Sequence, residues 1–209
     1  DQAVQSGVAG TAQADALPVR SAKEFSAYLA RRKPKARTGL LLTGGRVCVA
    51  EDGGRPFLLE DAALKSRDAR QFFQRGEFFC HDAKSLIHFL SRHGRDGIEL
   101  GEMKFDTMIA AYLAESSGRD FSWAAVASRE LGRPVRADSS DDVGHFFDVV
   151  ASLETKLAAA NAEKIFRDIE LPLVPVLADM EDRGILLDQK LLRQIGKKLN
   201  HELKKLTAD

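Results

Sequence analysis

The sequence has little cysteine, proline and tryptophan, and it lacks an excess of charge of either sign. Its 31 basic and 31 acidic residues give a net charge of zero, so any contact with a polyanion has to be local. No apolar run reaches the roughly 18 residues of a membrane-spanning helix, and no basic segment with an apolar signal core begins the chain. These absences predict a cytoplasmic protein without a membrane partner.

The two cysteines, Cys48 and Cys80, lie far apart and have no His or Cys companions at the spacing of metal ligands. Both fall in apolar runs typical of strands. We predict that they are reduced, buried core residues without a redox or ligand role. A hydrophobic content of 44% is sufficient for such a core.

The sequence of the first half of the chain indicates a linker followed by a strand-rich region. Residues 1–17 are small and polar, which predicts a flexible linker. Ser21 and Glu24 have the spacing of a capping box and predict a short helix that ends before Pro34. Glycine-rich turns then separate three segments that predict a β-meander: Thr38–Thr43, Arg46–Ala50 and Pro56–Leu59. A helix, a strand and a helix are predicted next, over Asp61–Gln74, Glu77–Cys80 and Ala83–His93.

From Gly97 onward the sequence predicts helices almost throughout. Asp106 and Asp120 are the predicted N-caps of two of them, over Thr107–Ala114 and Phe121–Leu131. Strands followed by helices predict a small mixed sheet covered by helices, of the α/β or α+β class.

The last third of the sequence begins with a polar connection over residues 132–144. A long helical region, His145–Glu181, follows it, and its prolines predict a kink or boundary near Glu170–Leu171. Asp188 is the predicted cap of a final helix, Gln189–Leu206.

Two stretches carry a resemblance to a known family. Glu170–Asp188 combines an acidic residue, a Pro-x-x-Pro-type apolar run, a Met-Glu pair, a basic residue with glycine, and an aspartate that begins a helix. Gly97–Leu100 is followed by the run Phe105–Leu113, which contains Phe-Asp-Thr-Met. The first stretch resembles the junction of the 3′–5′ exonuclease domain and the thumb in bacterial family A DNA polymerases. The second resembles the helix after their second nuclease motif.

The resemblance covers residues 20–209 and implies an RNase H-like (DnaQ-like exonuclease) fold. Residues 18–165 would form the mixed sheet flanked by helices, and residues 166–209 the first helices of a truncated polymerase thumb. The parent protein would be a DNA-directed DNA polymerase of replication and repair. Its partners would be DNA and, in cis, the polymerase palm, fingers and thumb.

The resemblance also implies where nuclease chemistry would sit. Exonucleases of this family hold two divalent metals with carboxylates from three sequence motifs. Here the first motif falls on Leu41–Gly45, and the metal-binding aspartates of the second and third fall on Leu86 and Phe146. Apolar side chains cannot hold magnesium. We therefore predict no catalytic residue, no metal site and no cofactor in this chain, and a scaffolding role for a vestigial domain.

Two alternatives stay open. The chain could be an active Mg²⁺-dependent 3′–5′ exonuclease that uses displaced carboxylates such as Asp82, Asp142 and Asp148. It could instead be a DNA-binding module that contacts phosphates through the basic residues of its last helix: Lys190, Arg193, Lys197, Lys198, Lys204 and Lys205. The same helix has an apolar stripe, formed by Leu191, Leu192, Ile195, Leu199, Leu203 and Leu206.

Two further groups of polar residues have structural explanations. His81-Asp82 could suggest acid-base chemistry, but Asp82 directly precedes a helix and is predicted to cap it. Glu99, Glu102 and Asp106 are predicted to lie in a solvated turn.

Overall fold

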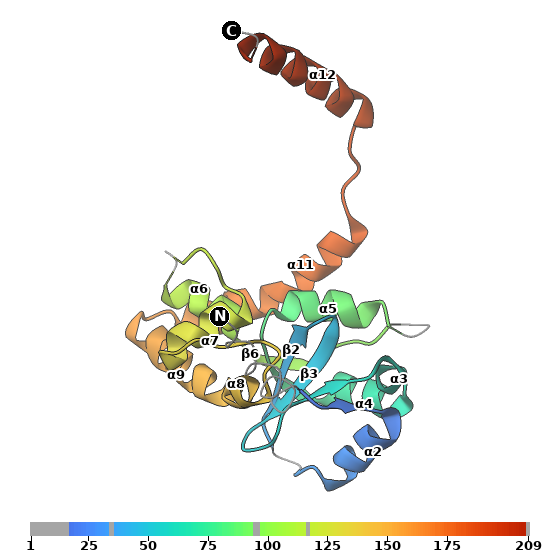
Figure 1. The fold of residues 1–209 in the computed structure, drawn as a ribbon, viewed down its shortest axis with the longest axis vertical. Helices are drawn as coiled ribbons and strands as arrows, with labels where there is room; N and C mark the ends of the chain where they lie inside the picture. Colours follow the sequence, from blue (N-terminus) through green and yellow to red (C-terminus); the bar gives the residue numbers. More distant parts are fainter. Residues whose placement is uncertain (1–16, 34–35, 94–96, 116–117, 208–209) are drawn as a thin grey trace, which may run out of the picture. The chain divides into compact units, whose positions relative to one another are not determined.

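The computed structural model describes residues 17–33, 36–93, 97–115 and 118–207 (Figure 1). The linker predicted over residues 1–17 therefore lies outside the described residues except for Leu17, which is buried in the core. The chain divides into two compact units, with the boundary between Ala178 and Asp179. No helix of the described part is long and apolar enough to cross a membrane.

A six-stranded mixed sheet forms the centre of the first unit, in the order β1-β4-β3-β2-β5-β6. Antiparallel pairing joins β2 to β3 and β3 to β4, and the other neighbours are parallel. The strands are β1 (Val19–Arg20), β2 (Thr38–Thr43), β3 (Arg46–Glu51), β4 (Phe57–Leu59), β5 (Glu77–Cys80) and β6 (Glu102–Asp106). The predicted α/β class and the four predicted strands are confirmed.

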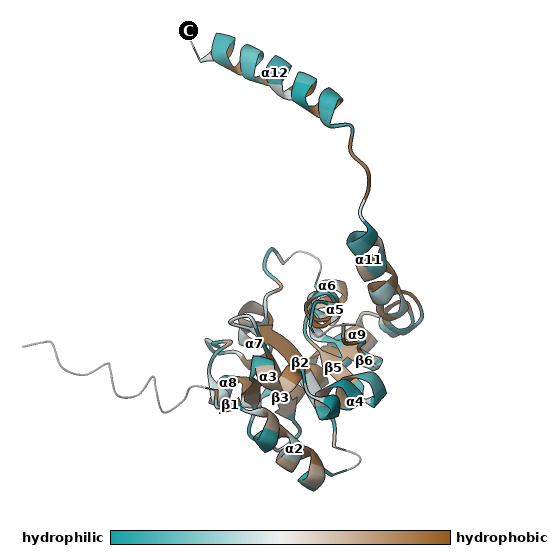
Figure 2. Cartoon of the chain, turned by 90° about the vertical axis from the view of Figure 1, so that its right-hand side faces the viewer, coloured by the Kyte–Doolittle hydropathy of each residue, from teal (hydrophilic) through white to brown (hydrophobic). Residues whose placement is uncertain are grey.

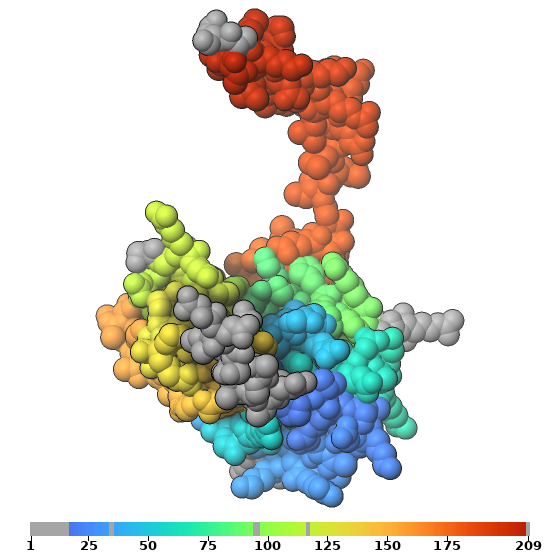
Figure 3. Space-filling view, in the orientation of Figure 1, coloured from blue at the N-terminus to red at the C-terminus, as the bar shows by residue number. Residues whose placement is uncertain are grey.

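Each face of the sheet carries its own hydrophobic core, because successive side chains of a strand point to opposite faces. Leu40 of β2 belongs to the core under α2 (Ala22–Arg31), α3 (Asp61–Leu64), α4 (Arg67–Arg75) and α5 (Ala83–Ser91). Leu41 belongs to the core under α6 (Thr107–Ala114), α7 (Trp123–Leu131) and α9 (Phe146–Ala159). Figure 1 shows the two groups of helices on either side of the strands, and in Figure 3 α2 to α4 (blue to turquoise) lie apart from α7 and α9 (yellow to orange).

The cysteines and several caps match the sequence predictions. Cys48 and Cys80 are buried and not joined by a disulfide. Burial raises the pKa of the Cys48 thiol to about 12, which keeps it protonated and unreactive. Ser21 forms the predicted capping box of α2 with Glu24. Asp82 caps α5 by accepting a hydrogen bond from Ser85 N at 3.2 Å, so the capping explanation is confirmed.

Strand β6 corrects the prediction of helices from Gly97 onward and of a solvated turn at Glu99, Glu102 and Asp106. Glu102–Asp106 pairs with β5 at the edge of the sheet, and Asp106 is fully buried. Strand β1 is also new, since two residues form a strand only by pairing with β4.

Three helix boundaries differ from the predictions. The helix predicted over Asp61–Gln74 is two helices, because Ser66 interrupts it and caps α4 through Ala69 N. Ser122, not Asp120, is the N-cap of α7, and Asp120 accepts a hydrogen bond from Ser122 N at 2.8 Å instead. The predicted polar connection contains a short helix, α8 (Ser140–Gly144), with Ser139 as its N-cap.

The long helical region predicted from His145 is divided. After α9, the chain forms α10 (Glu163–Ile165), a π-helical segment η1 (Phe166–Glu170) and α11 (Leu171–Arg183). The boundary predicted near Glu170–Leu171 is confirmed as a change from π to α geometry. Pro172 and Pro175 have no N–H to donate, so hydrogen bonding is interrupted at this point.

The second unit contains the end of α11 and helix α12 (Gln189–Leu206), separated by a non-helical link that begins at Gly184. Asp188 caps α12 as predicted, accepting from Leu191 N at 3.0 Å. The apolar stripe of α12 is exposed, with Leu199 at 63% and Leu206 at 78%. Figure 2 shows the contrast between its hydrophilic and hydrophobic residues.

Candidate functional site

The position aligned with the third nuclease motif is Phe146, the first residue of α9, and it is fully buried against β2. A β-carbon placed on Gly39 would lie 2.6 Å from Cδ1 of the Phe146 ring, so the ring rests directly on the strand. Leu41, two residues further along β2, belongs to the same core. Gly39, which the motif alignment did not include, is therefore a strand residue on which Phe146 packs directly.

An aromatic cluster surrounds Phe146. Its ring stacks on Trp123 of α7, with centroids 5.1 Å apart and planes 18° apart. His81 meets Trp123 edge to face at 5.7 Å. The Trp123 indole N–H is buried and has no hydrogen-bond partner among the described residues. These rings fill the space beside β2 with apolar groups, which disfavours any unpaired charge there.

The three positions aligned with the nuclease motifs do not converge. Leu41 and Phe146 lie in the core on one face of the sheet, whereas Leu86 is fully buried in the core on the other face. Each of the three is an apolar packing residue.

The displaced carboxylates proposed for an active exonuclease have separate structural partners. Asp82 caps α5. Asp142 pairs with Arg133 and accepts from Arg136 N at 2.9 Å, and although burial opposes the charge, these bonds lower its pKa. Asp148 is exposed and pairs with Nδ1 of His145 at 2.6 Å. Within the described ranges, no three or more His, Cys, Asp or Glu side chains are grouped to hold a metal ion.

Asp106 is a fully buried carboxylate, and the sequence did not predict its burial. Oδ2 accepts from Ala83 N at 2.6 Å, and Oδ1 accepts from Met108 N at 2.8 Å and Ile109 N at 3.2 Å. The predicted N-cap role in α6 is thus confirmed, and the same side chain also binds the start of α5. Burial raises its pKa to about 6, and the three backbone hydrogen bonds oppose that rise. It therefore joins two helix N-termini at the ends of β5 and β6.

His81 lies in the same region, between β5 and α5. Its Nδ1 shares a hydrogen bond of 2.8 Å with the Thr107 hydroxyl, which in turn donates to the carbonyl of Cys80 at 3.4 Å. Burial lowers the pKa of His81 to about 4, so the ring is neutral near pH 7. A neutral, packed imidazole fits a core role here.

Sequence comparison finds relatives among known proteins. The chain is 30% identical over 147 residues to DNA polymerase I of Mycobacterium leprae, a match that covers 59% of this chain and 16% of the relative. It is 27% identical over 179 residues to DNA polymerase I of Bacillus subtilis, covering 75% of this chain and 20% of the relative. The chain is related to bacterial DNA polymerase I. It spans 16–20% of the length of these two polymerases, and no known protein-family model matches it.

Solved structures show the same fold. The polymerase domain of Pol1 from M. smegmatis, in complex with a DNA primer-template and dNTP, matches with a TM-score of 0.73 and 22% identity over 90% of this chain and 35% of that chain. Brucella melitensis NrnC with bound Mg²⁺ matches with a TM-score of 0.55 and 14% identity over 71% of this chain and 84% of that chain. The fold is RNase H-like, as the resemblance to DNA polymerase I implied.

The six basic residues predicted to contact DNA all lie on α12 and are all exposed. At 3.6 residues per turn, they occupy the side of the helix opposite the apolar stripe. Two of them have side-chain contacts within α12: Arg193 donates to Gln189 at 3.3 Å, and Lys205 lies 3.7 Å from Glu202. The helix is therefore amphipathic, with one basic and one apolar face.

His81→Asn tests the buried neutral imidazole. The unfolded chain binds a proton at His81 below about pH 6.5, whereas the folded chain does so only below about pH 4. The free energy of unfolding contributed by His81 is therefore constant above about pH 6.5 and falls as the pH drops to 4. Denaturant melts at pH 7 and pH 4.5 should show wild type losing up to about 3 kcal/mol relative to His81→Asn. Equal pH dependence in the two proteins would mean that the fold does not lower the pKa of His81.

Proposed function

We propose that residues 18–165 are a vestigial 3′–5′ exonuclease-like domain of a DNA polymerase I. In this proposal the domain catalyses nothing and supports the polymerase core during DNA replication and repair. Residues 166–209 would begin the thumb, with palm and fingers in cis. The kinship with bacterial DNA polymerase I supports this assignment and a cytoplasmic location.

The observation that carries the proposal is the contact of Phe146 with Gly39. In a two-metal nuclease, carboxylates have to face each other across the space that the scissile phosphate enters. In the proposed alignment that space would lie beside Gly39 and Phe146, where the phenyl ring packs against the glycine and stacks on Trp123. The lack of a grouped metal-ligand set within the described ranges also favours loss of the activity.

Degradation of DNA from its 3′ end tests the proposal. Single-stranded DNA labelled at the 3′ end should stay intact with the full chain in excess Mg²⁺ or Mn²⁺. Asp148→Asn is the matched variant, because Asp148 is the exposed candidate carboxylate and its loss should not disturb the core. EDTA-sensitive degradation by wild type that Asp148→Asn abolishes would establish the active-exonuclease alternative.

A second candidate function is duplex binding by α12, favoured by the basic face of the helix. Six phosphate contacts would give the logarithm of the binding constant a salt slope of about −5 for duplex DNA. Replacing all six cations of α12 with Ala should remove most of that salt dependence. Alanine is a good helix former, so the helix itself should be retained. The control removes exposed cations of the first unit: Arg46→Ala, Arg67→Ala and Arg75→Ala. Equal duplex affinity in the two variants would contradict this function.

A further inference from the structure

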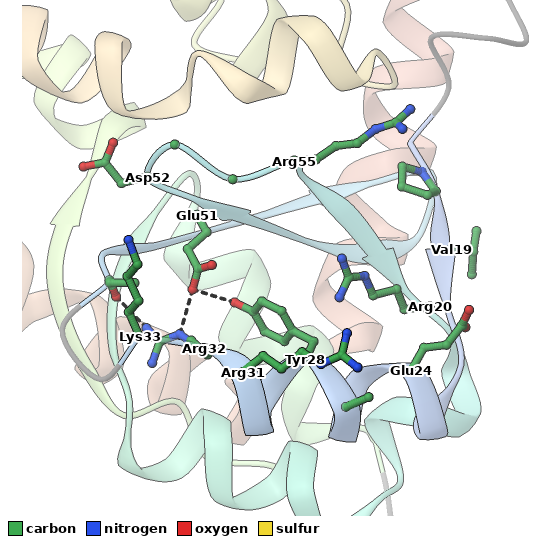
Figure 4. Close-up of a pocket in the computed structure, with 15 residues that line it drawn as sticks. Val19, Arg20, Glu24, Tyr28, Arg31, Arg32, Lys33, Glu51, Asp52 and Arg55 are labelled. Atoms are coloured by element: carbon green, nitrogen blue, oxygen red, sulfur yellow. Dashed lines mark hydrogen bonds and ion pairs between the residues drawn. The ribbon is translucent and has the colours of Figure 1, made fainter.

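A concavity of about 740 Å³ lies between α2, β1 and the turn that joins β3 to β4 (Figure 4). Five of its lining residues are basic: Arg20, Arg31, Arg32, Lys33 and Arg55. Three are acidic: Glu24, Glu51 and Asp52. We call this the basic groove. It is formed by the sheet edge and α2, and it includes none of the positions aligned with the nuclease motifs.

The acidic side chains of the basic groove are already engaged. Glu51 accepts from Arg32 at 3.0 Å and from the Tyr28 hydroxyl at 2.9 Å. Asp52 pairs with Arg37, which does not line the groove, at 2.5 Å. Glu24 accepts from Ser21 within the capping box of α2. Arg32 and Arg37 thus neutralise Glu51 and Asp52, whereas Glu24 keeps its negative charge because Ser21 is uncharged.

Four cations of the groove form no salt bridge among the described residues. One of them, Arg20, still lies near a carboxylate: the pKa of Glu24 is lowered by its hydrogen bonds with Ser21 and further by the charge of Arg20. Arg20 lies over the ring of Phe57, with its guanidinium carbon 3.9 Å from the centroid, so packing holds it in place. Arg55 donates only to the Ser140 hydroxyl, at 3.3 Å. Arg31 and Lys33 are exposed at the end of α2. Unpaired cations gathered around a concavity favour the binding of an anion with several charges.

The shape of the groove favours an extended ligand. A second concavity of about 430 Å³ shares Gly54 and Arg55 with it and reaches Ser140 and His145. Arg55 therefore lines both of these adjacent concavities. The aromatic ring within the groove, Tyr28, already meets Phe57 edge to face at 4.9 Å and has Arg20 5.1 Å from its centroid. Recognition would consequently depend on charge along a chain and not on stacking with bases.

We propose that the basic groove binds the phosphate backbone of a single nucleic-acid strand, without sequence preference. Arg31, Lys33 and Arg55 contact successive phosphates, and Arg20 supplies positive charge at the base of the groove. This site shares no residue with the α12 face, so each can be tested by its own substitutions.

The test measures binding of the full chain to fluorescent oligothymidylates by anisotropy at several salt concentrations. The groove variant carries Arg31→Ala, Lys33→Ala and Arg55→Ala, all at exposed positions. It should bind dT12 at least about tenfold more weakly at low salt, and its salt slope should be smaller by about 2, since each lost contact removes about 0.7. The control variant, with Arg46→Ala, Arg67→Ala and Arg75→Ala, has the same change in net charge and should bind like wild type.

Ligand length distinguishes a strand from a small polyphosphate. The proposal expects dT12 to bind more tightly than dT4, and free tripolyphosphate to compete weakly. Equal affinity of the groove and control variants would overturn the proposal. So would full competition by tripolyphosphate with no gain from dT4 to dT12, which would assign the groove to a small polyphosphate.

Discussion

Replacing Asp106 with Ala should lower the free energy of unfolding by about 3–5 kcal/mol, because one buried and two partly buried N–H groups would lose their acceptor. Those groups belong to the first turns of α5 and α6, so both helices would lose a cap. Asp106→Asn should cost less, since one amide oxygen can still accept on one side. Urea denaturation followed by circular dichroism measures the difference.

Asp120→Ala is the matched control for that substitution. Asp120 is also a helix-start aspartate with a backbone bond, to Ser122 N, but it is exposed. Its loss should cost less than about 1 kcal/mol. Similar losses for Asp106→Ala and Asp120→Ala would show that the buried carboxylate does not join the two helices.

Because Asp106 ionises, the effect of replacing it on the free energy of unfolding should depend on pH. Its pKa is raised to about 6 in the fold, so between about pH 4 and 6 the folded chain holds a proton that the unfolded chain has lost. Stability contributed by Asp106 is thus greatest below about pH 4 and decreases toward pH 6, by up to about 3 kcal/mol relative to Asp106→Asn. This slope is opposite to that of His81. The two slopes should largely cancel in wild type and appear only in the single variants.

Phe146→Ala should destabilise the chain by about 3–5 kcal/mol, because it empties a fully buried site between β2 and Trp123. Gly39→Ala should cost about 1–3 kcal/mol, since the new β-carbon would clash with the Phe146 ring. In the Phe146→Ala background, Gly39→Ala should cost almost nothing. The double-mutant cycle measures this coupling from denaturation curves.

Tyr112→Ala is the control for loss of an aromatic side chain in that cycle. Tyr112 is 52% exposed on α6, so its removal should cost less than about 1 kcal/mol. Additive effects of Gly39→Ala and Phe146→Ala would indicate that the ring does not rest on β2. The proposal of a vestigial exonuclease-like domain would then lose its main support.

The sequence predicted the elements whose signals are local. Strands β2 to β4 have apolar runs separated by glycine-rich turns, and β5 is a short apolar run between two helical patterns. The caps of α2, α5 and α12 have a polar side chain immediately before an apolar period. Strand β6 was not predicted, although Glu102-Met103-Lys104-Phe105 alternates polar and apolar residues, because the residues that follow it carry a strong helical pattern. Strand β1 has no such signal, since its pairing with β4 alone makes it a strand.

In the candidate site, too, contacts between residues distant in sequence could not be predicted from local patterns. Motif alignment predicted an apolar residue, Phe146, at the position of a metal ligand, but it could not show what the ring contacts. Gly39 became relevant only through a contact between residues distant in sequence. The burial of Asp106 likewise depends on α5 and α6 beginning side by side, which no local pattern encodes.

The central claim is that aromatic packing has replaced a two-metal nuclease site. Calorimetric titration of the full chain with Mn²⁺ tests it most directly, because metal binding requires grouped carboxylates whether or not a substrate is present. The account predicts no saturable heat, and identical traces for wild type and Asp148→Asn. Saturable binding of two ions per chain that Asp148→Asn abolishes would contradict it.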